Sequence, residues 1–307
     1  MHRCNSNTYN FSCSFCQSTK TGHGTHLIGY RCQITLGGDV IIRQSDCSAQ
    51  WLLVKKVKTE AKIRAPLVWE SPVGCRILDL KESLYDEALH LIKVERMPKQ
   101  RHYFREDPMC KAVSLLEDRL SVNEYLELIK VWLQDTTSVI ALSTVSERVV
   151  GVAVARISSD SEKIDTYNRV QIIEGIALQK IMKLLSAVII KTNAYEQFEH
   201  ESYFRIYIVC VHPSYQEKGL ERTLLEVCIE VAKSLKMPAI GGIFTSGPNQ
   251  LLANNVGFEL ISEIRYNNWI VNDRVVFDDP GRGNYSAAFM GLLVPIEEES
   301  ETLEETS

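Results

Sequence analysis

A polar turn between an apolar stretch and an amphipathic stretch holds the residues of this chain that are best suited to chemistry. Tyr203–Val211 is rich in β-branched and aromatic residues, His212 and Pro213 end it, and Gln216–Glu221 follows with a glycine at position 219. Arg222–Lys236 then carries apolar residues at helical spacing. The first amides of a helix lack partners within it and lie at its positive end, so this turn is suited to binding phosphate.

The turn matches neither a Walker loop nor a dinucleotide fingerprint, because it lacks both Gly-Lys-Ser/Thr and Gly-x-Gly-x-x-Gly. It resembles the acyl-CoA pyrophosphate loop of the GNAT N-acetyltransferases, where Val-x-Pro ends a strand and Gln/Arg-x-x-Gly-x-Gly/Ala opens a helix. Asn254–Leu260 resembles the Gly-Phe turn of that family. Tyr103–Met109 resembles the acidic-Pro-Leu segment of insect arylalkylamine N-acetyltransferases, which include dopamine N-acetyltransferase. The resemblance can be followed from about Cys75 to Pro295.

This resemblance implies an α+β layered domain of the GNAT fold, with a central mixed, mostly antiparallel sheet flanked by helices and a disordered N-terminal extension. We expect a low-order extension over 1–70, an acetyltransferase domain over 75–296 and an acidic disordered tail over 297–307. Helical spacing within 80–93, 109–133 and 170–190 supports the helices, the second with a break near Ser121. β-Branched runs at 139–142, 149–155, 203–211 and 238–245 support the strands.

The resemblance further implies acetyl-CoA as co-substrate, its arm lying between splayed strands at 205–211 and 239–245. Because backbone groups would bind the arm, substitution of the side chains in these strands would be tolerated. The expected cofactor-binding residues are Val209, Cys210, Val211, Gln216, Glu217, Lys218, Gly219, Leu220, Glu221 and Asn249.

Position 221 departs from the family pattern, because a glutamate occupies the place of the loop's last small residue. A carboxylate beside a diphosphate is repulsive, by about 1 kcal/mol at 4 Å in bulk water and severalfold more where solvent is excluded. Lys218 and Arg222 flank Glu221 and would offset that field, and its side chain is also free to turn outward. An acidic residue in the first turn of a helix also favours the helix dipole.

Acetyl transfer to an amine needs a base, donors for the oxyanion and a proton for the leaving thiolate. Glu106 and Asp107 precede Pro108, where the insect enzymes carry a glutamate, and either is a candidate base. Asp before Pro is equally typical of a helix start. Ser246 is the nearest candidate acid, and a helix cap is the alternative role for it. His212 is a possible shuttle or simply a turn residue.

Charge argues against nucleic acid as a partner. The chain has 307 residues and a net charge of −5, and six glutamates follow Ile296, so the remainder is nearly neutral. Phosphate contacts require clustered basic residues. No apolar run is long enough to span a membrane, and the polar start of the sequence does not resemble a secretory signal. We therefore expect a cytoplasmic monomer whose partners are a small amine substrate and acetyl-CoA, with no nucleic acid and no membrane.

The cysteines raise one alternative. Cys13 and Cys16, followed by His23 and His26, have the residue types of a zinc site, but the spacing is shorter than that of a usual finger. We expect an irregular extension and no metal. The leading prediction is thus an acetyl-CoA-dependent N-acetyltransferase that acts on a small primary amine, such as an arylalkylamine, by direct attack on the thioester. The alternative is a catalytically inactive GNAT paralogue that binds acyl-CoA or protein.

Overall fold

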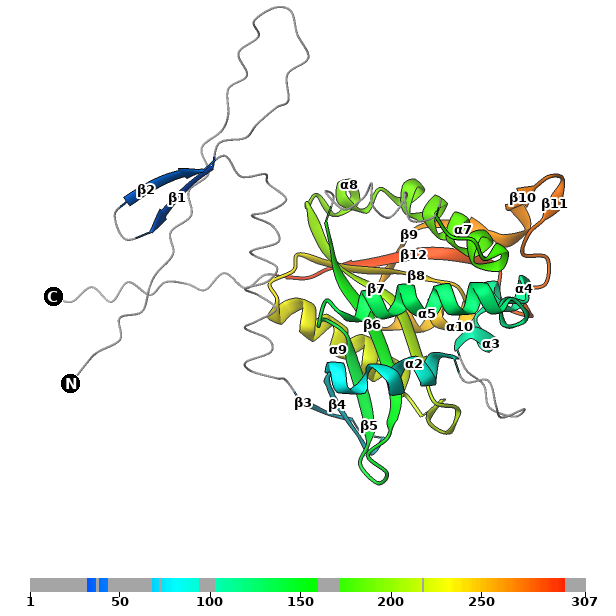
Figure 1. Cartoon of the computed structure of the whole chain (residues 1–307), viewed down its shortest axis with the longest axis horizontal. Coiled ribbons are helices and arrows are strands. Elements are labelled where there is room, and N and C mark those ends of the chain that lie inside the picture. Colours follow the sequence, from blue (N-terminus) through cyan, green and yellow to red (C-terminus); the bar gives the residue numbers. More distant parts are fainter. Residues whose placement is uncertain are drawn as a thin grey trace, which may run out of the picture. The chain divides into compact units, whose positions relative to one another are not determined.

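The computed structural model describes residues 32–36, 39–43, 68–71, 73–93, 103–159, 172–216 and 218–295 (Figure 1). The chain divides into two compact units, one up to Glu60 and one from Ala61. In the first unit, β1 (Cys32–Leu36) and β2 (Asp39–Arg43) form an antiparallel hairpin. Most of the predicted extension, the zinc alternative at Cys13–His26 and the acidic tail lie outside the described residues.

The second unit is built on an eight-stranded sheet in the order β3-β4-β5-β6-β7-β8-β12-β9. All neighbouring strands are antiparallel except β7 and β8, which are parallel, so the predicted mixed, mostly antiparallel sheet is confirmed. The first strand precedes Cys75, where we expected the domain to begin. The strands are β3 (Val68–Ser71), β4 (Cys75–Asp79), β5 (Val139–Ser143), β6 (Val149–Ser159), β7 (Ser202–Val211), β8 (Ala239–Phe244), β9 (Glu259–Arg265) and β12 (Ser286–Leu293).

Helices cover both faces of this sheet (Figure 1). On one face, the buried side chains of α2 (Tyr85–Lys93), α5 (Arg119–Leu133) and α7 (Ile176–Thr192) share one apolar core with β5, β6 and β7. On the other face, α9 (Leu220–Ser234) packs against β6, where Gly151 leaves room for its leucines. The shorter elements are η1 (Glu82–Leu84), α3 (Tyr103–Glu106), α4 (Pro108–Ala112), η2 (Leu115–Glu117), α8 (Ala194–Phe198), η4 (Pro213–Tyr215), α10 (Gly247–Asn255), η5 (Tyr266–Asn268), β10 (Ile270–Val271) and β11 (Arg274–Val275).

The long helix expected over 109–133, with a break near Ser121, is interrupted just before that residue. It separates into α4, η2 and α5, and the last begins after Asp118, whose carboxylate accepts a hydrogen bond from the Ser121 amide at 3.1 Å. The side chain of Glu124 caps a different helix, because it accepts hydrogen bonds from the amides of Glu174 and Gly175 directly before α7. The predicted break is therefore present, and Asp118 provides the cap that begins α5 after it.

The seam between β7 and β8 is closed for only part of its length. Three residue pairs join the strands, the last being Ile206 with Gly242. A Cβ added at Gly242 would lie 2.7 Å from the Ile206 carbonyl oxygen, so glycine allows this close approach. The register between β6 and β7 shifts immediately afterwards, leaving Tyr207 as the extra residue of a bulge. A bulge bends its strand, and beyond this point β7 and β8 are no longer paired.

None of the helices in the described ranges is long and apolar enough to cross a membrane.

Candidate active site

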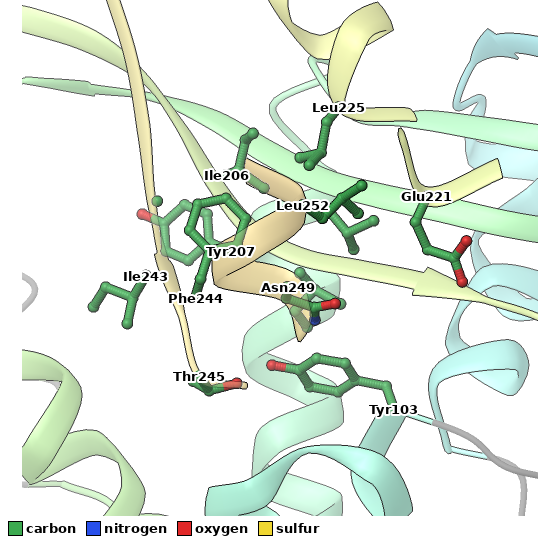
Figure 2. A pocket seen from close by; sticks show the side chains of 13 residues that line it. Tyr103, Ile206, Tyr207, Glu221, Leu225, Ile243, Phe244, Thr245, Asn249 and Leu252 are labelled. Carbon is green, nitrogen blue, oxygen red and sulfur yellow. The ribbon is translucent and has the colours of Figure 1, made fainter. Parts of the chain in front are cut away.

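The open part of the seam between β7 and β8 forms a cleft, shown in Figure 2. It holds about 490 Å³ of empty space including its open mouth. Side chains from both strands form its walls, α3 contributes Tyr103, and the helices α9 and α10 contribute Glu221 and Asn249. The lining residues are Tyr103, Ile206, Tyr207, Ile208, Val209, Glu221, Leu225, Gly242, Ile243, Phe244, Thr245, Asn249 and Leu252.

Backbone groups of β7 face this cleft at alternate residues. The amide of His212 donates to the carbonyl of Val150 at 2.8 Å, which sets the alternation of hydrogen bonds between β6 and β7. By that alternation Cys210 bonds to β6, whereas the N–H and C=O groups of Val209 and Val211 point away from β6, on the side where β8 diverges. Val209 lines the cleft, whereas Val211 is not among its lining residues and its carbonyl accepts a hydrogen bond from the Gln216 side chain. The Cys210 side chain lies on the face of the sheet that α2 covers, with its sulfur 3.8 Å from the Leu91 carbonyl.

The predicted phosphate turn leads into α9 as expected. Gly219 is the N-cap residue with φ of +89°, a left-handed conformation that favours glycine, and an added Cβ would meet nothing within 4 Å. The amides of the first helical turn, beginning at Leu220, have no carbonyl partners within the helix and are suited to an anion. Gln216 donates to the Val211 carbonyl at 3.4 Å, and the Lys218 ammonium lies 5.1 Å from the Tyr215 ring centre. Glu217 lies outside the described residues.

The glutamate that departs from the family pattern lies in the cleft. Glu221 lines it together with Asn249, and Figure 2 shows its carboxylate at the edge of the cleft, apart from the other labelled side chains. Leu220, by contrast, is buried in the core beneath the turn. Ser246 caps α10 by accepting a hydrogen bond from the Asn249 amide at 3.3 Å, and it is absent from the cleft lining. The structure therefore gives Ser246 the capping role that the sequence left open.

The two acidic candidates before Pro108 differ sharply in environment. Glu106 is exposed, whereas Asp107 is buried. One carboxylate oxygen of Asp107 accepts hydrogen bonds from the amides of Met109 and Cys110, at 3.0 and 2.9 Å, and thereby caps α4. Burial raises the pKa of Asp107, and the hydrogen bonds it accepts offset part of that rise. A raised pKa makes this carboxylate a better proton acceptor near neutral pH.

Thr245 connects the buried carboxylate to the cleft. Its hydroxyl donates to the second carboxylate oxygen of Asp107 at 2.5 Å, and Thr245 itself lines the cleft. The Tyr266 hydroxyl donates to the Thr245 carbonyl at 2.6 Å, so the backbone of this residue is held from the opposite side. Asp107 thus reaches the cleft through a hydroxyl whose position is set by two hydrogen bonds. We did not predict a role for Thr245, because its partner lies far away along the chain.

Tyr103 provides a second hydroxyl at the same end of the cleft. Figure 2 shows its phenol directed towards Thr245. Burial, with Tyr125 and Asp107 nearby, raises the pKa of Tyr103 well above its usual value and keeps the phenol protonated. Tyr103 lies one helical turn before Asp107, whose amide donates to its carbonyl at 2.8 Å. We did not predict a role for Tyr103, although its spacing of four residues from Asp107 places both on one turn.

His212 is placed as a turn residue. Its Nδ1 accepts a hydrogen bond from the Ser214 amide at 3.2 Å, which begins η4. Burial lowers the pKa of this imidazole. The same effect raises the pKa of the Cys210 thiol to about 12, which makes a thiolate nucleophile there unfavourable. No group of three or more metal-ligating side chains occurs within the described residues.

Comparison of the structure with solved structures identifies its fold. Arylalkylamine N-acetyltransferase 2 from Aedes aegypti aligns with a TM-score of 0.65 and 21% identity, over 72% of this chain and 99% of that one. A putative arylalkylamine N-acetyltransferase 7 from the same mosquito gives 0.66 and 21%, over 75% and 96%. Drosophila melanogaster polyamine N-acetyltransferase gives 0.58 and 17%, over 71% and 99%. No protein-family model and no curated protein matches the sequence. The chain has the fold of the GNAT N-acetyltransferases.

Proposed function

We propose that this protein is an acetyl-CoA-dependent N-acetyltransferase that acetylates a small primary amine by direct attack on the thioester. The observation that carries the proposal is the open seam between β7 and β8, where the backbone N–H and C=O groups of Val209 face away from β6 inside a lined cleft. A pantetheine arm carries amides of its own and can pair with such positions as a short extra strand. The neighbouring first turn of α9 supplies amides for the diphosphate.

The amine must lose a proton before or during attack, and the pair of Thr245 and Asp107 provides a path for it. The amine nitrogen attacks the thioester carbon while its proton passes to the Thr245 hydroxyl oxygen. The hydroxyl proton of Thr245 then moves along its existing hydrogen bond to Asp107. The raised pKa of Asp107 suits it to accept that proton.

Collapse of the tetrahedral intermediate breaks the bond between carbon and sulfur and releases the CoA thiolate. Tyr103, whose phenol stays protonated, lines the cleft at the same end as Thr245 and is a candidate donor for this thiolate. Its proton neutralises the leaving thiolate, and solvent then reprotonates the phenol. Tyr103→Phe is expected to lower kcat by about 10²-fold with little change in KM for acetyl-CoA. A loss of CoA affinity with unchanged kcat would contradict this role.

The structural relatives indicate which amines to test first. Their names describe enzymes that act on arylalkylamines and on polyamines, the latter forming N-acetylagmatine. The cleft of this chain has aromatic walls at Tyr207 and Phe244. The test is acetyl-CoA turnover over a panel containing phenylethylamine, dopamine, agmatine and spermidine, combined with melting temperatures measured with and without CoA. Turnover of at least one amine and a CoA-dependent rise in Tm are expected. Absence of both would refute the proposal.

One observation favours a second candidate function, that of a GNAT-fold binding module without catalysis. The Glu221 carboxylate lines the cleft in which the cofactor arm is proposed to lie, and it opposes a diphosphate electrostatically. Glu221→Gly separates the two functions, because removal of the side chain restores the small residue of the family pattern. An increase in CoA affinity accompanied by turnover supports the enzyme. An increase in affinity with no turnover of any amine supports the binding module.

A further inference from the structure

Arg205 of β7 is a buried cation that the proposed acetyl transfer does not use. It is 8% exposed, and Arg205 and Asp107 are the two charged side chains among the buried residues that the structure describes. Asp107 has hydrogen-bond partners, whereas no salt bridge or hydrogen bond of the Arg205 guanidinium occurs among the described residues. Burial of a charge without a counter-ion is costly, so packing alone does not account for an arginine at this position.

The surroundings of Arg205 leave its charge uncompensated. Arg156 of β6 is its partner in the strand register, and the Asp135 carboxylate lies 2.5 Å from Arg156 Nε and forms a salt bridge with it. These three side chains together carry one net positive charge. Tyrosines are uncharged at neutral pH, and the other titratable groups with the largest electrostatic effect on Arg205 are Tyr195, Tyr203 and Tyr207.

This positive charge lies directly behind the wall of the cleft. The Arg205 guanidinium carbon is 4.5 Å from the centre of the Tyr207 ring, and Tyr207 lines the cleft. Trp132 of α5 stacks on the same ring, with ring centres 4.3 Å apart and planes at 29°. Contacts with a cation and an indole hold the ring in place. A substrate that lies against Tyr207 is therefore one ring away from a buried positive charge.

Arg205, Tyr207 and Thr245 follow one another along the seam between β7 and β8. The two strands are parallel, Arg205 pairs with Gly241, and Thr245 follows Gly241 by four residues. At about 3.3 Å per residue, the levels of Arg205 and Thr245 are about 13 Å apart, with Tyr207 between them. An amine whose nitrogen meets the Thr245 hydroxyl and whose body lies against Tyr207 therefore directs its distal end towards Arg205.

Two carboxylates act at other places along the cleft. Asp107 lies behind Thr245, where the reacting nitrogen would bind. Glu221 lines the cleft from α9, and Figure 2 shows it well apart from Tyr207. The distal end of an acceptor beside Tyr207 is thus nearer to the arginine than to either carboxylate.

We propose that Arg205 selects the acceptor amine by the charge of its distal end, against cations and in favour of anions. This inference rests on the proposed acetyl transfer and narrows its acceptor class to monoamines with a neutral or acidic distal group, excluding diamines and polyamines. For two unit charges about 8 Å apart at an effective dielectric constant of about 20, the Coulomb energy corresponds to about a 30-fold change in an equilibrium constant. Arginine is always protonated, and a buried charge is screened little by salt.

Three 2-phenylethylamines that carry a carboxylate, a carboxamide or an amidinium group at the para position test the proposal. The three groups share one planar shape and differ in charge, and none of them competes with the reacting amine. With acetyl-CoA, kcat/KM should be lowest for the amidinium compound, about 30-fold below that of the carboxamide. An amidinium compound that reacts as well as the carboxamide, or better, would overturn the proposal. This order is measured on the unchanged protein and needs no variant.

Variants separate charge from structure. Arg205→Met removes the charge at similar length, and relative to the carboxamide it should raise kcat/KM for the amidinium compound and lower it for the carboxylate compound, each by about 30-fold. Arg205→Lys keeps the charge and should preserve the order. Lys130→Met removes an exposed cation of α5 and should change none of the three values. A purely structural role of Arg205 would move all three compounds in the same direction, and that result would overturn the proposal.

Calorimetric titration of the three compounds into the CoA-bound protein makes the same comparison without turnover. Turnover of the compounds with no ranking by charge would overturn the role of Arg205 and leave acetyl transfer standing. Binding ranked by charge with no turnover would support the role of Arg205 and contradict acetyl transfer. Compounds that neither bind nor react while CoA binds would overturn the role of Arg205 as well.

Discussion

The two ends of the cleft differ in burial and therefore in how they should respond to substitution. At the inner end, Asp107, Thr245 and Tyr266 form a buried chain of hydrogen bonds in which every link is within 3.0 Å. At the outer end, the first turn of α9 and the Glu221 side chain lie nearer to solvent. A buried polar group must be satisfied or the fold is destabilised, whereas an exposed group can be exchanged with little effect on folding. The inner end should therefore resist substitution structurally, and the outer end should respond mainly through binding.

The largest expected effect is on stability at the inner end. Asp107→Ala removes the acceptor of the Met109 and Cys110 amides and of the Thr245 hydroxyl, and we expect the free energy of unfolding to fall by about 3 kcal/mol. Asp107→Asn is the control, because an amide oxygen can still cap α4, and it should lose much less. Lys218→Ala, at the outer end, should change stability by under about 0.5 kcal/mol. Urea unfolding of the three variants measures their free energies of unfolding. Equal losses in Asp107→Ala and Lys218→Ala would contradict the expected difference between the two ends.

The next effect is on catalysis and concerns Thr245. Thr245→Val keeps the shape of the side chain but removes the hydroxyl between the cleft and Asp107. Turnover with a reactive amine should fall by about 10²-fold, the usual size of a lost general-base path, while KM for acetyl-CoA changes little. Thr245→Ser, which retains the hydroxyl, should recover most of the rate. Equal activity of the valine and serine variants would show that the proton does not pass through this residue.

At the outer end the expected effect is smaller and has the opposite sign. Glu221→Gln removes the negative charge but keeps the length of the side chain, so affinity for CoA should increase by about five- to tenfold, corresponding to about 1 kcal/mol. Calorimetric titration at two salt concentrations measures it, and the gain should shrink as salt rises. An unchanged Kd would mean that the diphosphate does not bind near position 221.

The smallest effect is a dependence of stability on pH. The pKa of Asp107 is higher in the folded protein than in the unfolded chain, where a value of about 3.9 applies. Such a group contributes stability that is present below the unfolded pKa and is lost as pH rises through the folded pKa. The free energy of unfolding of the protein should therefore fall relative to that of Asp107→Asn as pH rises from 4 towards neutrality. Unfolding curves measured across that range would contradict this if the difference stayed constant or increased.

The fold and the turn at the outer end of the cleft could be predicted from local sequence. The strand, turn and helix around Gly219 and the turn at Gly257 are continuous segments, so their conformations can be inferred from neighbouring residues. The inner end did not follow in the same way. Asp107 and Thr245 are 138 residues apart, and their hydrogen bond exists only because α3 and α4 pack beside the end of β8. Sequence alone kept both Glu106 and Asp107 as candidate bases, and burial distinguishes them in the structure.

Protection of individual backbone amides on addition of CoA tests the central claim most directly. Hydrogen exchange read residue by residue should show slower exchange at Val209 and Val211, whose amides point away from β6 on the side of the open seam, once CoA is present at saturation. The Cys210 amide is already bonded to β6 and should not change. If the exchange of Val209 and Val211 is unaffected by saturating CoA, the cleft does not bind the cofactor arm and the account is wrong.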